Sequence, residues 1–265
     1  MSIVILVGGS SAEGNPEHRY LVGAFLDRFG DQITRIVTAE PVNRSFGERL
    51  TRMLKRGNYL ERFARWRYEG EYGPNAVDLQ RLLEPNAAAP VMPGDNKRTH
   101  VASHNSRECE AILDEDKPDV IVVYGTRIIQ QHIFKRAGRV TLNMHTGLSP
   151  YYRGDSTLFW PIYNNAPDHL GVTVHELAGT IDGGDIAATA TVPYTQGDRE
   201  ADLFAKGVKA GTAIYLDCVQ AALDDTLECY SQELSLGQEY RWTHRTVAAE
   251  RRVTNQLDQW AQTPP

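Results

Sequence analysis

The stretch that decides the fold and the site runs from residue 139 to residue 188 and reads RVTLNMHTGLSPYYRGDSTLFWPIYNNAPDHLGVTVHELAGTIDGGDIAA. Its first part, 140–144, is a short apolar run of the kind that a strand buried on both faces presents. Asn143 and His145 lie two positions apart, so on an extended strand both side chains point to the same side. Farther on, Asp182 precedes two glycines in a turn that can carry its carboxylate back over the strand ends.

The polar groups in this stretch suit one kind of reaction. When an amine attacks an acyl carbon, negative charge develops on the carbonyl oxygen, and donors already aimed at that oxygen lower the barrier. The amide of Asn143 and a protonated His145 can supply such donors, while Asp182 can pair with the imidazole and relay protons through a water. Asp185 starts the next expected strand, so we expect a turn or capping role for it. We therefore predict acyl transfer at this trio, with no metal.

Apolar runs alternate with helical patterns along the chain, which predicts an α/β fold with a doubly wound, mostly parallel sheet. The expected strands are 2–8, 32–38, 119–124, 140–144, 171–177 and 186–192, and the expected helices are 18–29, 103–113, 128–136 and 202–223. Ligands bind such sheets at the carboxyl ends of strands. We expect a catalytic domain at 1–225, with a helical insertion at about 43–70, and a short C-terminal extension at 226–265.

Composition excludes several classes of protein. The chain has 265 residues and a formal net charge of −6, and a protein that grips a nucleic-acid backbone would usually be basic. No apolar run is long enough to span a bilayer, so we expect no membrane segment. The three cysteines show no paired spacing, which favours a reducing, cytoplasmic setting without disulfides. His100 and His104 lie four apart, the spacing of one face of a candidate helix, but no third metal ligand is fixed, so a polar helix face is the preferred interpretation.

The insertion is rich in arginine. Between residues 43 and 68 the sequence has eight basic residues and only two glutamates, and apolar residues recur at helical spacing. A solvated pair of helices with a core-facing stripe explains this pattern. A basic surface for a phosphorylated substrate, a partner or a membrane explains it as well, and both interpretations stay open.

Several motifs in this chain resemble those of one known family. They are Asn143-Met-His145, Leu148-Ser-Pro150-Tyr-Tyr-Arg153-Gly154, Gly171-Val-Thr-Val-His175 and Ile181-Asp182-Gly-Gly. In this order they are similar to the 10-formyltetrahydrofolate-dependent formyltransferases, which act on glycinamide ribonucleotide, methionyl-tRNA or sugar amines. The resemblance covers residues 118–225 well, the first strand and helix loosely, and residues 40–100 hardly at all. It implies a Rossmann-like formyltransferase fold and assigns Asn143, His145 and Asp182 as the catalytic triad.

The resemblance also implies where the ligands bind. For the folate it indicates two segments, with the residues Arg127, Ile128, Ile129, Glu176, Gly179, Thr180 and Ile181. For the second substrate the expected residues are Gly9 and Ser10, in a loop whose N–H groups can bind phosphate, and Arg153 and Trp160. The formyl donor is then 10-formyltetrahydrofolate, used as a co-substrate.

The acceptor is a separate question. A methionyl-tRNA formyltransferase carries a further C-terminal domain, and about forty residues after the last expected helix are too few for one. The residues that follow Tyr152 look closer to the sugar-amine branch, so we expect N-formylation of a small, nucleotide-linked amino sugar. A formyltetrahydrofolate hydrolase and a non-catalytic folate- or partner-binding homologue remain the alternatives. The expected partners are a small-molecule amine and folate, without nucleic acid or membrane, and a homodimer is left open.

Overall fold

The computed structural model describes residues 1–9, 14–39, 59–70, 72–86 and 91–265. Within them a seven-stranded sheet has the order β3-β2-β1-β4-β5-β7-β8. Its strands are β1 (Ile3–Val7), β2 (Ile33–Ala39), β3 (Arg98–Val101), β4 (Val120–Tyr124), β5 (Val140–His145), β7 (Gly171–Glu176) and β8 (Ile186–Thr191). Strands β1 to β5 pair in parallel, while β7 runs antiparallel to both β5 and β8. The predicted α/β class with a mostly parallel sheet is therefore confirmed.

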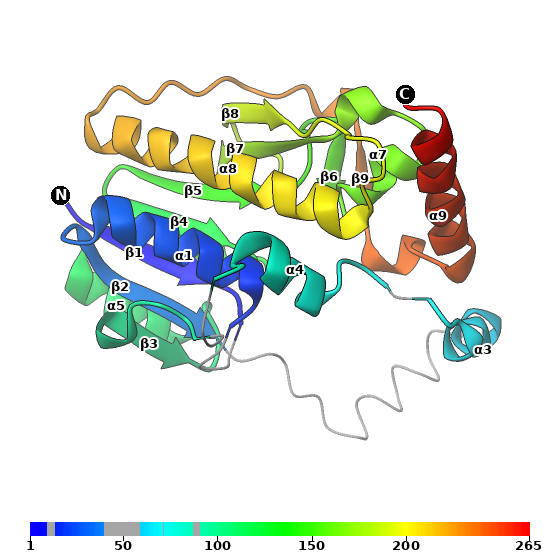
Figure 1. The fold of residues 1–265 in the computed structure, drawn as a ribbon. Coiled ribbons are helices and arrows are strands. Elements are labelled where there is room, and N and C mark those ends of the chain that lie inside the picture. The colour runs from blue at the N-terminus through cyan, green and yellow to red at the C-terminus, as the bar shows by residue number, and fades with distance from the viewer. Residues whose placement is uncertain (10–13, 40–58, 71, 87–90) are drawn as a thin grey trace.

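Helices cover both faces of this sheet, which is why its central strands are apolar throughout. Every residue of β1 and of β4 is buried. On one face lie α1 (Pro16–Phe29) and the long α8 (Glu200–Leu223), and on the other lies α5 (Arg107–Asp116) (Figure 1). The two faces form separate apolar clusters, one built around Phe25 and Tyr215 and the other around Leu113 and Ile133.

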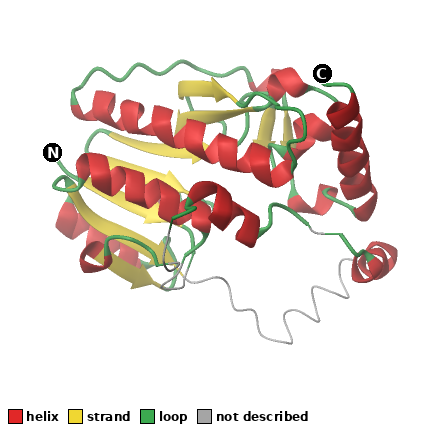
Figure 2. Ribbon diagram, viewed as in Figure 1, coloured by secondary structure: helices red, strands yellow, loops and turns green. Residues whose placement is uncertain are grey.

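Shorter elements complete the molecule. Among the described residues the other helices are α3 (Tyr59–Arg67), α4 (Ala76–Leu83), α6 (Gln131–Phe134), α7 (Phe159–Tyr163) and α9 (Val247–Gln262). The single-turn 3₁₀ helices of the same residues are η1 (Asp95–Lys97), η2 (Pro167–His169), η3 (Leu234–Leu236) and η4 (Trp242–His244). A second, two-stranded sheet pairs β6 (Tyr152–Gly154) with β9 (Gln238–Tyr240) in parallel. Helices and strands are distinguished by colour in Figure 2.

Some expected elements were wrong. The segment 103–113 does not start as a helix, because the side chain of Ser106 accepts a hydrogen bond from the Cys109 N–H and caps α5 from residue 107 onward. The helix expected at 128–136 is shorter in the structure, where α6 spans Gln131–Phe134. The helix expected around His100 is absent: His100 lies on β3, while His104 contacts the Val37 carbonyl oxygen through Nε2 at 3.1 Å.

The C-terminal extension is part of the core rather than a tail. Helix α9 buries Val253, Leu257 and Trp260 in one cluster with Phe159 of α7 and Leu203 of α8. These apolar residues of α9 recur every three or four positions, which is the spacing of one helical face. Residues 226–265 therefore share a hydrophobic core with the segment 158–203.

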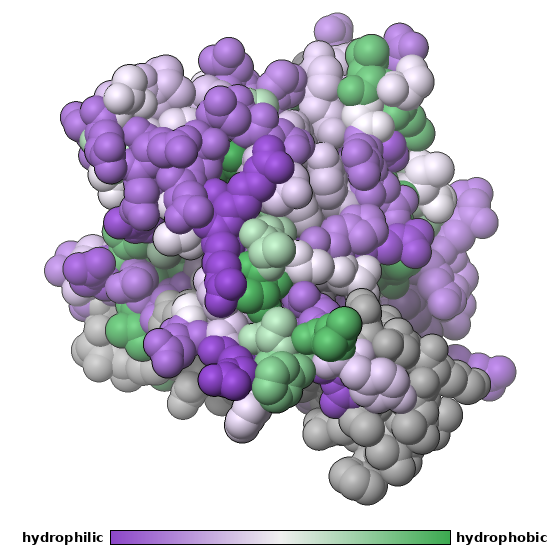
Figure 3. All heavy atoms as spheres, turned by 90° about the vertical axis from the view of Figure 1, so that its right-hand side faces the viewer, coloured by the Kyte–Doolittle hydropathy of each residue, from purple (hydrophilic) through white to green (hydrophobic). Residues whose placement is uncertain are grey.

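Helix α3 is the described part of the predicted insertion, whose residues 43–58 lie outside the described residues. It does form a helix, but its apolar side chains do not face a core: Leu60 is 86% exposed and Trp66 is 78% exposed. The face of the molecule that carries α3 and α9 is largely hydrophilic, with hydrophobic residues gathered in small patches (Figure 3). Among the described helices, none is both long and apolar enough to cross a membrane.

A buried charge cluster joins the extension to α8. Arg245, just before α9, donates to both carboxylate oxygens of Glu200 at 2.9 and 2.7 Å and also pairs with Glu250. Its guanidinium also lies 4.0 Å from the ring centroid of Phe159. Burial raises the pKa of Glu200, although Arg245 acts in the opposite direction. Arg245 therefore pairs with two carboxylates that are largely shielded from solvent.

We expect Arg245→Met to destabilise the protein by about 3–5 kcal/mol, because it leaves two buried carboxylates without their cation. Urea unfolding at neutral pH measures the change. Arg199→Met is the matched control, since Arg199 pairs with Asp258 where both side chains are at least half exposed, and we expect it to cost at most about 1 kcal/mol. Equal effects of the two substitutions would contradict this account of the cluster.

Candidate active site

The predicted trio meets at the carboxyl end of β5. Asn143 and His145 are on the same side of that strand, as their spacing predicts, and β7 pairs with β5 beside them so that Asn143 faces His175. The turn after β7 brings Asp182 back to this point. His145 is buried and Asn143 is half-buried, so the group lies just beneath the surface.

The central contact joins an imidazole to a carboxylate. His145 Nδ1 lies 3.3 Å from Asp182 Oδ2, and its Nε2 lies 2.9 Å from the Tyr152 carbonyl oxygen. Both ring nitrogens therefore face oxygen acceptors. A doubly protonated imidazolium satisfies both contacts, whereas either neutral tautomer turns a lone pair toward an oxygen. The site is thus built to accommodate a positively charged His145 beside a carboxylate.

A second imidazole, not assigned a role from the sequence, completes the group. His175 Nε2 lies 3.5 Å from Asp182 Oδ1 and 3.1 Å from Asn143 Nδ2, while its Nδ1 is 2.7 Å from the Glu176 carbonyl oxygen. The proton on Nδ1 is fixed by that carbonyl. When Nε2 is also protonated it donates to Asp182, and when it is not it accepts from Asn143. His175 thus links the amide to the carboxylate, and its place in the Gly-Val-Thr-Val-His string was the signal for it.

The carboxylate is held in its charged form. Burial acts to raise the pKa of Asp182, but the charge of His145, the contact with His175 and a 2.8 Å hydrogen bond from the Gly154 N–H outweigh burial and hold the pKa well below its usual range. A group whose pKa is perturbed by named partners in this way marks a functional site. Asp182 can therefore serve as a permanent anion opposite a protonated imidazole.

The turn that carries Asp182 has an unusual backbone. Asp182 itself has φ +45°, in the left-handed region that few non-glycine residues adopt. Two residues on, a Cβ at Gly184 would collide with the Glu176 carbonyl oxygen, so only glycine fits. Asp185 is exposed and its carbonyl oxygen accepts from the Glu176 N–H at 2.8 Å, as expected for a residue that closes the turn.

The residues expected to bind folate lie on two segments flanking β5. Ile128 is 71% exposed and Ile181 is 37% exposed, and Arg127 is exposed between β4 and α6. Gly179 and Thr180 are exposed as well, whereas Ile129 is buried in the core and Glu176 is half-buried. Exposed apolar side chains with a nearby cation suit a flat apolar ring that carries an anionic tail. Ile129 and Glu176 contribute mainly to the framework.

The residues expected to bind the second substrate are spread more widely. Gly9 follows β1 and packs against the buried imidazole of His18, and Ser10 lies outside the described residues. Arg153 is half-buried and donates to the Leu234 carbonyl oxygen at 3.3 Å. Trp160 is only 3% exposed.

Trp160 belongs to the core. Its ring stacks on Tyr240 at 4.6 Å between centroids, and its Nε1–H donates to the Asp155 carbonyl oxygen. No face of the ring is left for a ligand, so the expectation of a substrate contact there was wrong. The reason is that α9 and β9 pack over α7, which the sequence did not reveal.

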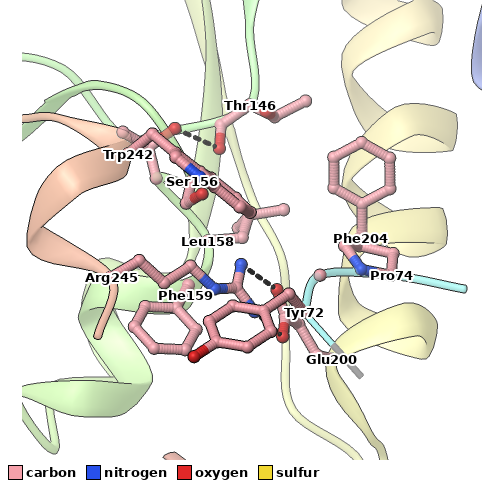
Figure 4. A pocket seen from close by; sticks show the side chains of 12 residues that line it. Tyr72, Pro74, Thr146, Ser156, Leu158, Phe159, Glu200, Phe204, Trp242 and Arg245 are labelled. Atoms are coloured by element: carbon pink, nitrogen blue, oxygen red, sulfur yellow. Dashed lines mark hydrogen bonds and ion pairs between the residues drawn. The ribbon is translucent and has the colours of Figure 1, made fainter. Parts of the chain in front are cut away.

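A cavity of about 320 Å³ opens beside the trio (Figure 4). It begins at Thr146, directly after His145, and its walls come from α7, from the start of α8 and from η4. The lining residues are Tyr72, Gly73, Pro74, Thr146, Ser156, Thr157, Leu158, Phe159, Glu200, Phe204, Trp242 and Arg245. Four aromatic rings are among them, and its one cation, Arg245, is already engaged by carboxylates. The cavity thus suits a ring with apolar faces.

Known proteins resemble this chain in sequence and in fold. A family model described as formyl transferase matches residues 73–219. A methionyl-tRNA formyltransferase from Bacteroides thetaiotaomicron is 29% identical over 121 residues, which are 46% of this chain and 37% of that protein. Another from Streptococcus pyogenes is 33% identical over 94 residues, or 36% and 30% of the two chains. The chain thus spans about a third of the length of these curated relatives.

Solved structures share the fold at low identity. A 4-N formyltransferase from Francisella tularensis has a TM-score of 0.57 at 15% identity and covers 91% of this chain and 77% of its own. An N-formyltransferase from Helicobacter canadensis, in complex with folinic acid and dTDP-3-aminofucose, has a TM-score of 0.55 at 16% identity over 92% and 72% of the chains. A phosphoribosylglycinamide formyltransferase from Anaplasma phagocytophilum has a TM-score of 0.52 at 15% identity over 91% and 98%.

The paired Asp182 predicts a pH-dependent contribution to stability. Because its folded pKa lies below the unfolded value of about 3.9, its charge stabilises the fold above that value, and the contribution is lost as the pH falls. We expect Asp182→Asn to lower the urea midpoint at about pH 6 and to differ progressively less from the parent as the pH falls below about 4. Asp185→Asn, an exposed carboxylate in the same turn, is the control. A difference that stays constant from about pH 6 to about pH 3 would show that Asp182 is not held as described.

Proposed function

The chain belongs to the formyl transferase family, and on that premise we propose that it moves a formyl group from 10-formyltetrahydrofolate to the primary amine of a small acceptor, a sugar amine. The observation that carries this proposal is the convergence of Asn143, His145 and Asp182, held together with His175, at the carboxyl end of β5. The trio lies inside the part of the chain that matches the family, and its groups are those that the reaction requires.

The first step is attack by the acceptor nitrogen on the formyl carbon. A carbon–nitrogen bond forms while the carbonyl electron pair moves onto oxygen. Asn143 has two amide N–H donors and uses one at most for His175, so the other can face that oxygen. The His145 Nε2–H contacts the neutral Tyr152 carbonyl, and an anionic oxygen is the stronger acceptor and competes for this donor. Both residues therefore act on charge as it develops.

The second step moves protons and breaks the donor's bond. The bond between the formyl carbon and the folate nitrogen breaks, its electron pair stays on that nitrogen, and the nitrogen takes up a proton. The acceptor nitrogen, which has become cationic, loses one. His145 can give its Nε2 proton to the folate nitrogen and then take up the proton that the acceptor nitrogen loses, while Asp182 stays ionised beside Nδ1 and keeps the imidazole in place.

The folate fits the exposed edge formed by the segments after β4 and β7. We assign Ile128 and Ile181 to the pterin, since both are exposed apolar side chains, and Arg127 to the anionic part of the molecule. Leu177 packs against the buried cluster that contains Ile129, so the two segments are joined beneath this edge. When bound there, the folate supplies the activated formyl group.

The acceptor then enters through the cavity after Thr146. Its aromatic lining favours the apolar face of a sugar ring, which supports the sugar-amine branch. The Helicobacter canadensis structure holds a dTDP-linked amino sugar together with a folate compound, and that pairing supports the same class of acceptor for this chain. A nucleotide-linked sugar of this kind is the finer form of the proposal.

Replacement of His145 tests the reaction. We expect His145→Ala to lower kcat for amine formylation by about 10²- to 10⁴-fold, because it removes both an oxyanion donor and a proton carrier. Binding of a non-reactive folate analogue, followed by calorimetry, should persist. His132→Ala, an exposed histidine of α6, is the control. Full turnover in His145→Ala would refute the assignment, and formate release at the same rate with and without amine would identify a hydrolase instead.

Truncation of Trp242 tests where the acceptor binds. Trp242 is 44% exposed on the cavity wall, so Trp242→Ala should raise KM for the amino sugar about tenfold, which is about 1.4 kcal/mol, and leave KM for the folate unchanged. Steady-state kinetics with each substrate varied in turn measures both. Trp66→Ala, an exposed tryptophan of α3 outside the cavity, should change neither. A larger effect on the folate KM would place the folate, rather than the amine, in this cavity.

A further inference from the structure

The turn that carries Asp182 is held by residues beyond the part of the chain that matches the family. That match ends at residue 219, and the segment 230–240, here called the bracing segment, runs beside the turn. Its first residue, Tyr230, exchanges two backbone hydrogen bonds with Ile186 at 2.8 and 3.0 Å. The segment is thereby fixed to the strand that begins four residues after Asp182.

One side chain of the bracing segment grips the turn directly. The amide nitrogen of Gln232 donates to the carbonyl oxygen of Asp182 at 3.0 Å and to that of Gly184. The amide cannot be reversed, because its own oxygen would then face two carbonyl oxygens. Gln232 Oε1 is buried and has no hydrogen-bond partner among the described side chains and backbone groups. A buried oxygen without a hydrogen bond is unfavourable, so the two bonds that the amide nitrogen donates are what the residue contributes here.

The far end of the bracing segment fixes the other partners of the same site. Strand β9 pairs in parallel with β6, with Tyr152 opposite Gln238 and Gly154 opposite Tyr240. Strand β6 supplies two groups to the site: the Tyr152 carbonyl oxygen contacts His145, and the Gly154 N–H donates to Asp182.

The close approach of β9 to β6 is permitted by a glycine. Gly154 has φ +92°, and a Cβ there would collide with the Tyr240 carbonyl oxygen. The Gly154 N–H therefore donates to the Asp182 carboxylate from a strand that packs directly against the bracing segment. The bracing segment thus supports the backbone of Asp182 through Gln232 and its carboxylate through Gly154 of the paired strand.

We propose that Gln232 is a positioning residue that holds the Asp182 carboxylate against His145. This role rests on the proposed function, in which that carboxylate holds the imidazole in place. Asp182 sits in a left-handed conformation that its own backbone does not favour, so it needs support from outside the turn. Gln232 touches no reacting atom and acts only through Asp182.

The test is Gln232→Met, which keeps the length of the side chain and removes its donors. We expect kcat to fall about 10- to 100-fold with a smaller change in KM, because a carboxylate displaced by a fraction of an ångström loses its partner. With weaker pairing the pKa of Asp182 rises, so the acid limb of the kcat profile should move to higher pH. A merely structural role would not move that limb. Gln259→Met, the same change at an exposed position of α9, should leave rate and profile unaltered.

Two further measurements show whether Gln232 acts on the rate through Asp182. In the Asp182→Asn background, Gln232→Met should cause no additional loss of kcat, since the two residues act as one unit. Gln232→Lys, whose ammonium can donate to the same two carbonyl oxygens, should recover part of the lost rate. The proposal is wrong if Gln232→Met and Gln259→Met behave alike, if the losses add in the double variant, or if Gln232→Lys is as slow as Gln232→Met.

A readout without turnover separates this proposal from the proposed function. Carbon-13 NMR of the aspartate carboxylates follows Asp182 as the pH is changed. We expect its titration to shift in Gln232→Met and not in Gln259→Met, whether or not any amine is formylated. If the parent protein is inactive but Gln232→Met still shifts the titration, the formyl transfer is overturned and the positioning role stands. If the parent protein is active but Gln232→Met leaves the titration unchanged, the positioning role is overturned and the formyl transfer stands.

Discussion

The contact between the Asp182 carboxylate and the His145 imidazole is the constraint on which the rest of the site depends. A carboxylate this far from water is tolerated only when its charge is matched and its oxygens accept hydrogen bonds. Here two imidazoles and one backbone N–H do this, at 3.3, 3.5 and 2.8 Å. Removing any one of them would leave the anion partly unpaired, which is why strands from three parts of the chain converge on this point.

The sheet provides this convergence through one reversal of direction. Strands β1 to β5 are parallel and end at the same edge, where β5 presents Asn143 and His145. Strand β7 then runs antiparallel beside β5, so that His175 stands opposite Asn143. The turn between β7 and β8 brings Asp182 within reach of both histidines. A continued parallel order would have needed a crossover helix at this place and would have carried the carboxylate elsewhere.

The strength and the limits of prediction from sequence both follow from periodicity. The central strands were predictable because burial on two faces requires continuous apolar runs, and the shared side of Asn143 and His145 follows from a repeat of two. The meeting of Asp182 with His145 was expected from the Gly-rich turn and its chemistry, and the family resemblance assigned the same trio, although separation along the chain alone carries no geometry. Strand β3 was missed since an edge strand with the sequence Arg-Thr-His-Val has no apolar run. Gln232 gave no signal at all: its importance lies in two carbonyl oxygens that only the folded turn exposes.

The pairing of β6 with β9 also sets the order in which a nascent chain can finish its site. The ribosome releases β1 through α8 before it releases β9, and domains begin to fold while synthesis continues. Yet the Tyr152 carbonyl and the Gly154 N–H are placed by a strand that follows β8 and α8 in the chain. The scaffold can therefore collapse early, while the polar centre is completed last.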